Sequence, residues 1–193
     1  HNGPSGEVRG EGHRYFRQAG EKAATRSANR KAIVDFEQAL SALAHLPERK
    51  ENIEAAIDLR FRVRTCLIQL GDFAPILQRL REAEALARAI GDERRLGWVH
   101  SYLCQYYAVA ATPENAVAVG QIALDIAESL DDFALRVATR FFLGIAYRRL
   151  GAHEDARAIL LKNVDALPGD LEREHFGIAG PVAAWSRSNL VGC

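Results

Sequence analysis

Two groups of polar side chains in this sequence could do chemistry as they stand. His153, Glu154 and Asp155 are neighbours with metal-binding groups, and residues 172–175 (Glu-Arg-Glu-His) place carboxylates beside an imidazole. The His-Glu-x-x-His spacing of a helical zinc site is absent, and polar residues at a helix start interact with its unpaired N–H groups. A short run of charges is most often a solvated surface. We therefore predict neither a metal site nor a cofactor here.

Nucleophilic and phosphate-binding motifs are also missing. The sequence has no Gly-x-Ser-x-Gly elbow and no GxxxxGK[ST] phosphate loop. Cys66, Cys104 and Cys193 are too widely spaced for a CxxC metal site, and their odd number argues against a disulfide framework. We expect no catalytic residue in this stretch, and three thiols in a reducing, cytoplasmic compartment.

The elements that position any other site are best read from residues 143–163, which look like two short helices joined by a tight turn. Gly144 and Tyr147 share one helical face, Gly151 ends the first helix, and Ala156 begins a new stripe with a 3.6-residue period. Small residues are needed where two helix backbones cross closely. We therefore expect Gly144 and Ala156 to form the closest contact of this helical hairpin.

The same pattern returns along the chain at a nearly constant interval. Equivalent positions in the second helices are separated by 44, 40 and 40 residues, and they are Ala39, Ala83, Ala123 and Asn163. The order Leu-Gly-x-x-Tyr, Gly, Ala, large apolar residue and Pro resembles the tetratricopeptide repeat (TPR), whose usual period is about 34 residues. The resemblance implies an all-α fold, a right-handed α-solenoid of helical hairpins with its first helices lining the concave side.

Turn signals divide the sequence into repeats. Asn29 is the expected N-cap of one second helix, and Thr112 followed by Pro113 marks the start of another. Residues 1–6 read as a linker or an addition to the native chain, and residues 7–193 as a single TPR-like domain. Its expected repeats are 7–46, 47–91, 92–131 and 132–168, followed by a partial fifth helix at 180–193.

Charge and hydropathy exclude some classes of partner. The 25 basic and 25 acidic residues cancel, so we expect no nucleic-acid partner and no attraction to an anionic membrane. No apolar run reaches the ~18 residues that a membrane-spanning helix needs. The chain contains no Met, and we interpret it as part of a longer protein.

A narrower resemblance rests on several short phrases in a matching order. They are similar to the C-terminal repeats of large bacterial regulators in which an adenylate/guanylate cyclase domain precedes a P-loop ATPase module. This implies a signalling protein with cyclase or ATPase activity elsewhere, because the catalytic residues of those domains have no counterpart here. The phrases occupy residues 19–29, 36–40, 80–103, 144–151, 172–177 and 186–187.

The repeat alignment also predicts a ligand groove on the concave side. Its candidate residues form a cationic, aromatic and amide lining, which suits an extended or helical peptide with acidic and apolar residues. The chaperone-type carboxylate clamp does not carry over, because it needs Lys and Asn where this chain has Arg17 and Glu21. The alternative is that these side chains only solvate or pack the groove. The candidates are Arg17, Arg62, Trp98, Tyr102, Gln105 and Arg148.

Two functions from different classes follow. The first is a protein-interaction or regulatory module that binds a peptide, a partner protein or another domain of its own chain. The second is a sensory domain that binds a small-molecule effector inside the superhelix. For the terminal helix at 181–193 we expect one of two outcomes, packing back on the preceding second helix or pairing with a second chain as a dimer.

Overall fold

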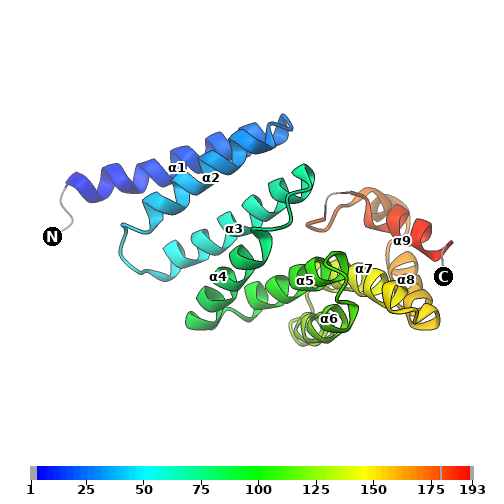
Figure 1. Ribbon diagram of the computed structural model, residues 1–193. Coiled ribbons are helices and arrows are strands. Elements are labelled where there is room, and N and C mark those ends of the chain that lie inside the picture. The colour runs from blue at the N-terminus through cyan, green and yellow to red at the C-terminus, as the bar shows by residue number, and fades with distance from the viewer. Residues whose placement is uncertain (1–3, 179, 192–193) are drawn as a thin grey trace. The chain divides into compact units, whose positions relative to one another are not determined.

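The chain is helical throughout the part that the structure describes. The computed structural model covers residues 4–178 and 180–191, with side chains from residue 12 onward, and these ranges contain no strand. By contacts between residues, the chain divides into two compact units, His1–Asp92 and Glu93–Cys193. The all-α solenoid class predicted from the repeats is thereby confirmed. Figure 1 traces both units from blue to red along the chain.

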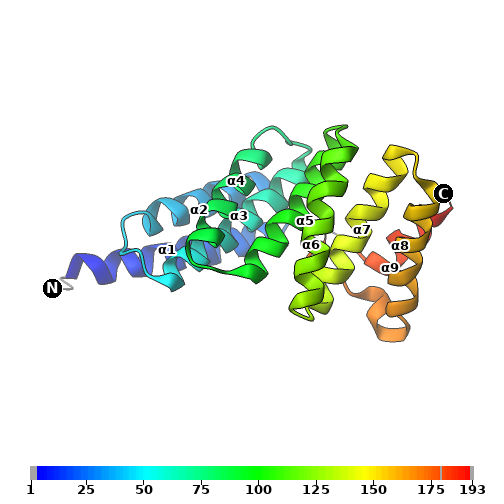
Figure 2. The ribbon, with the colours of Figure 1, turned by 90° about the horizontal axis from the view of Figure 1, so that it is seen from below.

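Within each unit, each helix packs against the next one in sequence, as stacked hairpins require. The first unit consists of α1 (Pro4–Thr25), α2 (Asn29–Leu43), α3 (Lys50–Leu70) and α4 (Ile76–Ala89). The second consists of α5 (Glu93–Val109), α6 (Pro113–Ser129), α7 (Phe133–Leu150), α8 (His153–Ala166), the 3₁₀ turn η1 (Gly169–Arg173) and α9 (Val182–Leu190). In the second unit the first helices α5 and α7 also contact each other directly, side by side in both views (Figure 2).

The hairpin of α7 and α8 closes around Gly144, although its partner differs from the one expected. A Cβ added at Gly144 would lie 2.5 Å from Cδ2 of Leu160, and the three nearest atoms all belong to that leucine. The predicted Gly144–Ala156 contact is therefore wrong in its second member. Leu160 lies one helical turn further along α8, and its longer side chain fills the space above the glycine.

The crossing between α1 and α2 repeats this arrangement. A Cβ at Gly20 would meet the Phe36 ring at 2.5 Å, and the spacing from glycine to large residue equals that from Gly144 to Leu160. In the hairpin of α5 and α6 the order is reversed, because the glycine is Gly120 on the second helix. Its Cβ position lies 2.9 Å from the sulfur of Cys104 on α5 and 2.5 Å from Cδ2 of Leu143 on α7. The same crossing is thus built in two opposite ways.

Helix ends follow the turn residues with two exceptions. Gly151 adopts a left-handed conformation (φ 81°), and its N–H bonds back to carbonyls of the last turn of α7, as predicted. Asn29, however, is the first residue of α2, and the preceding Ala28 holds the cap position without a side-chain bond, so the predicted Asn29 cap is wrong. Thr112 holds the N-cap position and Pro113 is the first residue of α6, as predicted, but the Thr112 hydroxyl donates to the carbonyl of Tyr107 and forms no capping bond.

The N-terminal boundary is also corrected. Helix α1 begins at Pro4, so residues 4–6 belong to a helix and not to the linker expected over 1–6. Proline is compatible with the first turn of a helix because its missing N–H would have had no partner there. Residues 1–3 lie outside the described part.

Helix α9 packs on α8 and α7 of the same chain. Val182 and Ala183 are fully buried in this contact, while Val191 is exposed just beyond the helix end. Packing back on the preceding hairpin is thus the arrangement adopted within this chain, and pairing with a second chain stays a prediction. Cys193, at the end of the expected 180–193 helix, lies outside the described residues.

Candidate binding site

Trp98 and Tyr102 form the centre of the candidate site on α5. They stand one turn apart, and their ring centroids are 5.4 Å from each other. The backbone of Gly177 lies directly on these rings, because a Cβ at that position would be 3.2 Å from the Trp98 ring and 3.4 Å from the Tyr102 hydroxyl oxygen. Tyr102 is consequently only 7% exposed. Glycine is favoured at 177 both by this proximity and by its φ of 74°.

The same C-terminal segment continues across α7. The Phe176 ring meets Phe133 at the start of that helix edge to face, with centroids 5.7 Å apart. Further along, Trp185 of α9 packs on Phe141 at 5.9 Å. These pairs extend the apolar contact along most of the length of α7.

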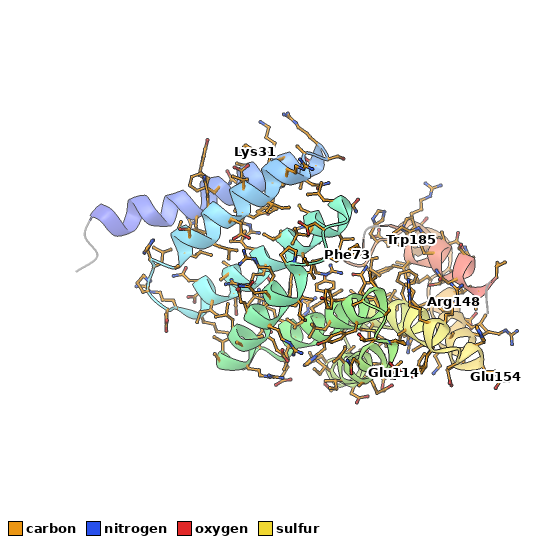
Figure 3. The ribbon with its side chains drawn as sticks, viewed as in Figure 1. Lys31, Phe73, Glu114, Arg148, Glu154 and Trp185 are labelled. Carbon is orange, nitrogen blue, oxygen red and sulfur yellow. The ribbon has the colours of Figure 1, made fainter. Side chains whose placement is uncertain are left out.

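A polar contact completes this series. Arg148 donates a hydrogen bond from Nη1 to the side-chain oxygen of Asn189, which lies one turn beyond Trp185 on α9. Figure 3 labels Arg148 and Trp185, whose side chains lie on the same side of the second unit. We call the side of α5 and α7 that carries Trp98, Tyr102, Phe141 and Arg148 the first-helix face.

The covering segment, residues 174–178 and 180–190, is also tied to the preceding 3₁₀ turn η1. Glu172 and Arg187 form an ion pair of 2.6 Å, and this hydrogen bond lowers the pKa of the Glu172 carboxyl. Ile178 and Ser186, which belong to the segment, are buried. The polar group predicted at 172–175 is thus partly engaged in fastening α9.

Of the six predicted groove residues, the second unit brings three together against one segment. They are Trp98, Tyr102 and Arg148, while Gln105 is half-buried on α5. Arg17 and Arg62 belong to the first unit and are exposed, and Arg17 is paired with Glu21 at 3.1 Å. A groove that combines all six side chains stays a prediction.

The residues first considered for metal or acid–base chemistry lie at the surface. His153, Glu154 and Asp155 form the exposed first turn of α8, and Glu154 extends into solvent (Figure 3). Within the described residues, no three His, Cys, Asp or Glu side chains are grouped closely enough to hold a metal ion. Likewise, none of the described helices is long and apolar enough to cross a membrane.

A separate cavity of about 370 Å³ lies in the first unit. Its walls are mostly apolar, with Leu40 and Leu43 from α2, Ile53 from α3 and Leu86 from α4, and Arg60 adds a guanidinium group. Arg60 already bonds to Glu82 at 2.9 Å and to the carbonyl of Ala56. The linker at 44–49 forms part of the wall. It has six residues where the linker between α6 and α7 has three.

Sequence reasoning expected the terminal helix to pack back on the preceding second helix, but it did not predict that residues of this segment cover the first-helix face. Gly177, Trp185 and Asn189 have no counterpart in the repeat pattern, because they follow the last complete hairpin. A signal was nevertheless present, since the phrases at 172–177 and 186–187 that carry the narrower resemblance fall within or beside this segment. The length of the linker between α8 and α9 was a second signal.

Solved structures that resemble this chain are helical-repeat proteins. The apo form of RapI superposes with a TM-score of 0.72 at 16% identity, over 79% of this chain and 54% of that one, so the chain spans about half of RapI. A putative kinesin light chain from Podosopora anserina with nearly identical TPR-like repeats gives a TM-score of 0.68 at 16% identity, over 92% of this chain and 82% of that one. The sequence matches no family model and no curated protein. The fold is thus that of a TPR-like repeat region.

Proposed function

We propose that this chain is a protein-interaction module whose first-helix face binds a peptide from a partner protein or from another domain of the same protein. One observation carries the proposal: this face already holds a peptide segment, the covering segment of the chain itself. Gly177 lies on Trp98 and Tyr102, and Asn189 accepts a hydrogen bond from Arg148. A surface that binds one segment through rings and a guanidinium group has the chemistry to bind another.

The composition of the face favours a peptide over other ligands. Aromatic rings offer large contact areas with few rotatable bonds, and an arginine side chain can form a forked pair with a carboxylate. First helices of stacked hairpins present such residues as a continuous row, which matches an extended or helical peptide in length.

Selection of binding peptides from a displayed library against the whole chain tests the proposal. We expect Trp98→Ala and Arg148→Ala each to weaken a selected peptide by about tenfold or more, as at other central contact residues. Arg157, exposed on the second helix α8, provides the matched control, and Arg157→Ala should leave the affinity unchanged. Equal loss from both arginine variants would mean non-specific charge attraction, and the proposal would fail.

The cavity of the first unit supports a second candidate, the binding of a small-molecule effector. A mostly apolar cavity of about 370 Å³ is within the range of ligand pockets. Ala56 lies in its wall, so Ala56→Phe should fill it. With 1-anilinonaphthalene-8-sulfonate as the probe, fluorescence enhancement by the native chain that Ala56→Phe removes would support this function, and unchanged enhancement would exclude it.

We also propose that the module regulates a catalytic domain in a longer protein. The support is the sequence resemblance to repeats that follow cyclase and P-loop ATPase domains, and the resemblance concerns no residue of a catalytic site within this chain. The reading frame of the whole protein tests this directly. A frame that encodes neither domain would refute the association.

A further inference from the structure

The C-terminal segment combines two arrangements. Its helix α9 packs on α8 and α7, as α7 packs on α6 and α5, so α9 lies where the first helix of a further repeat would lie. Residues 176 and 177, which precede α9, instead lie against two first helices at once, at Phe133 on α7 and at the Trp98 ring and the Tyr102 hydroxyl on α5. This part of the segment thus runs across the row of first helices, as a bound peptide would.

We propose that the covering segment (residues 174–178 and 180–190) is an internal ligand of the first-helix face, and that the partner is a helical peptide that replaces it. This inference rests on the proposed function and specifies its ligand. The partner helix presents an aromatic side chain to Phe141 and an acceptor, four residues later, to Arg148. Trp185 and Asn189 show this spacing within the chain, one turn apart on one face of α9.

The chemistry of the Arg148 contact indicates how a partner peptide binds the first-helix face more tightly than the internal segment does. Asn189 offers a neutral amide oxygen to a guanidinium group. A carboxylate at the same place would form a charge-assisted hydrogen bond, which is roughly twice as strong. A negative charge near the end of a helix is unfavourable, but this effect is smaller at an exposed position. The partner motif is therefore an aromatic residue followed four positions later by Asp or Glu.

A labelled synthetic peptide with the sequence of residues 174–191 tests the internal ligand, with its affinity for the whole chain measured by fluorescence anisotropy. While the face is occupied, the apparent affinity is reduced by the fraction of free sites. Trp185→Ala and Gly177→Val each weaken the internal segment by different means and leave the face itself intact. We expect both variants to bind the peptide at least about tenfold more tightly than the native chain.

Ser188, exposed on α9, gives the control, because Ser188→Ala should bind the peptide as the native chain does. Equal affinities for the native chain and both releasing variants, or no binding to any of them, would overturn the internal ligand. The proposed function is judged separately by the library-selected peptides. If these bind through Trp98 and Arg148 but are indifferent to Trp185→Ala, the module stands and the internal ligand falls.

A second peptide tests the acidic motif. The same sequence with Asn189→Asp should bind the Trp185→Ala chain several-fold more tightly than the Asn peptide, and the difference should disappear in the additional presence of Arg148→Ala. An aspartate peptide that binds no better than the asparagine peptide would refute the acidic partner.

Discussion

The hydroxyl of Thr139 donates a 3.0 Å hydrogen bond to the hydroxyl oxygen of Ser101, and this bond joins α7 to α5 in the interior of the second unit. Both residues are completely buried. Ser101 lies one turn from Trp98 on α5, so the bond fixes the two first helices directly beneath the aromatic part of the first-helix face.

Removing one hydroxyl of this pair should destabilise the second unit. Ser101→Ala leaves the Thr139 hydroxyl buried without this acceptor, at a cost of about 1–3 kcal/mol in unfolding free energy. The double variant Ser101→Ala, Thr139→Val removes both polar groups and should recover much of the loss. Urea unfolding of the single and double variants measures this, and additive losses would contradict the paired arrangement.

The crossing of α7 and α8 should not tolerate a side chain at Gly144. Gly144→Leu forces Leu160 or the helix backbone to move, and we expect a loss of about 1–3 kcal/mol, seen as a lower thermal midpoint. Gly12 is a helical glycine with open space at its Cβ position, so Gly12→Ala should instead gain roughly 0.5–1 kcal/mol. A midpoint unchanged by Gly144→Leu would contradict the described packing.

Asp132 should make the free energy of unfolding depend on pH in the acidic range. Its burial alone would raise the carboxyl pKa, but the N–H of Leu135 and the side chain of Arg94, at 2.6 Å, reverse this and lower the pKa below its usual 3.8. Because the folded pKa is below the unfolded one, the contribution is complete above about pH 4 and is lost as the pH falls through the folded value.

Asp132→Ala should therefore cost about 0.5–2 kcal/mol at pH 7, the range for a lost helix N-cap. The difference from the native chain should shrink below pH 4. Asp132→Asn keeps a capping side chain and serves as the control for charge, so it should lose less than alanine does. A difference that grows on acidification would have the wrong sign and refute the assignment.

The two described cysteines should resist alkylation in the native protein. Cys66 and Cys104 are at most 3% exposed, and burial raises the pKa of both thiols, more strongly for Cys104. Iodoacetamide at pH 8 should modify both in urea and neither in buffer, as measured for each site by mass spectrometry. Rapid native modification of Cys104 would show that α5 and α6 open readily.

The sequence predicted the helices well because each rests on local signals. Gly151 and Pro113 mark a helix end and a helix start wherever the chain folds. The predicted Asn29 cap is wrong because the residue at which a helix begins depends on the backbone conformation of its neighbours, which residue type alone does not determine. Leu160, and not Ala156, contacts Gly144 because its longer side chain reaches across the helix crossing. Hydrophobic periodicity carries no information about side-chain length. The packing of the terminal helix on the preceding hairpin was expected, but the contact of Gly177 with Trp98 was missed because long-range contacts have no local pattern.

The reversed crossing in the hairpin of α5 and α6 has an evolutionary consequence. Exchanging single helices between the hairpin of α5 and α6 and that of α7 and α8 would set Leu160 against Cys104, two larger side chains at one crossing, or Gly120 against Gly144, two glycines with no side chain between them. Each helix therefore fits only the partner helix of its own hairpin, although the two hairpins share a period of 40 residues. The array cannot be lengthened by copying single helices, and duplication or recombination must carry complete hairpins with their own neighbours.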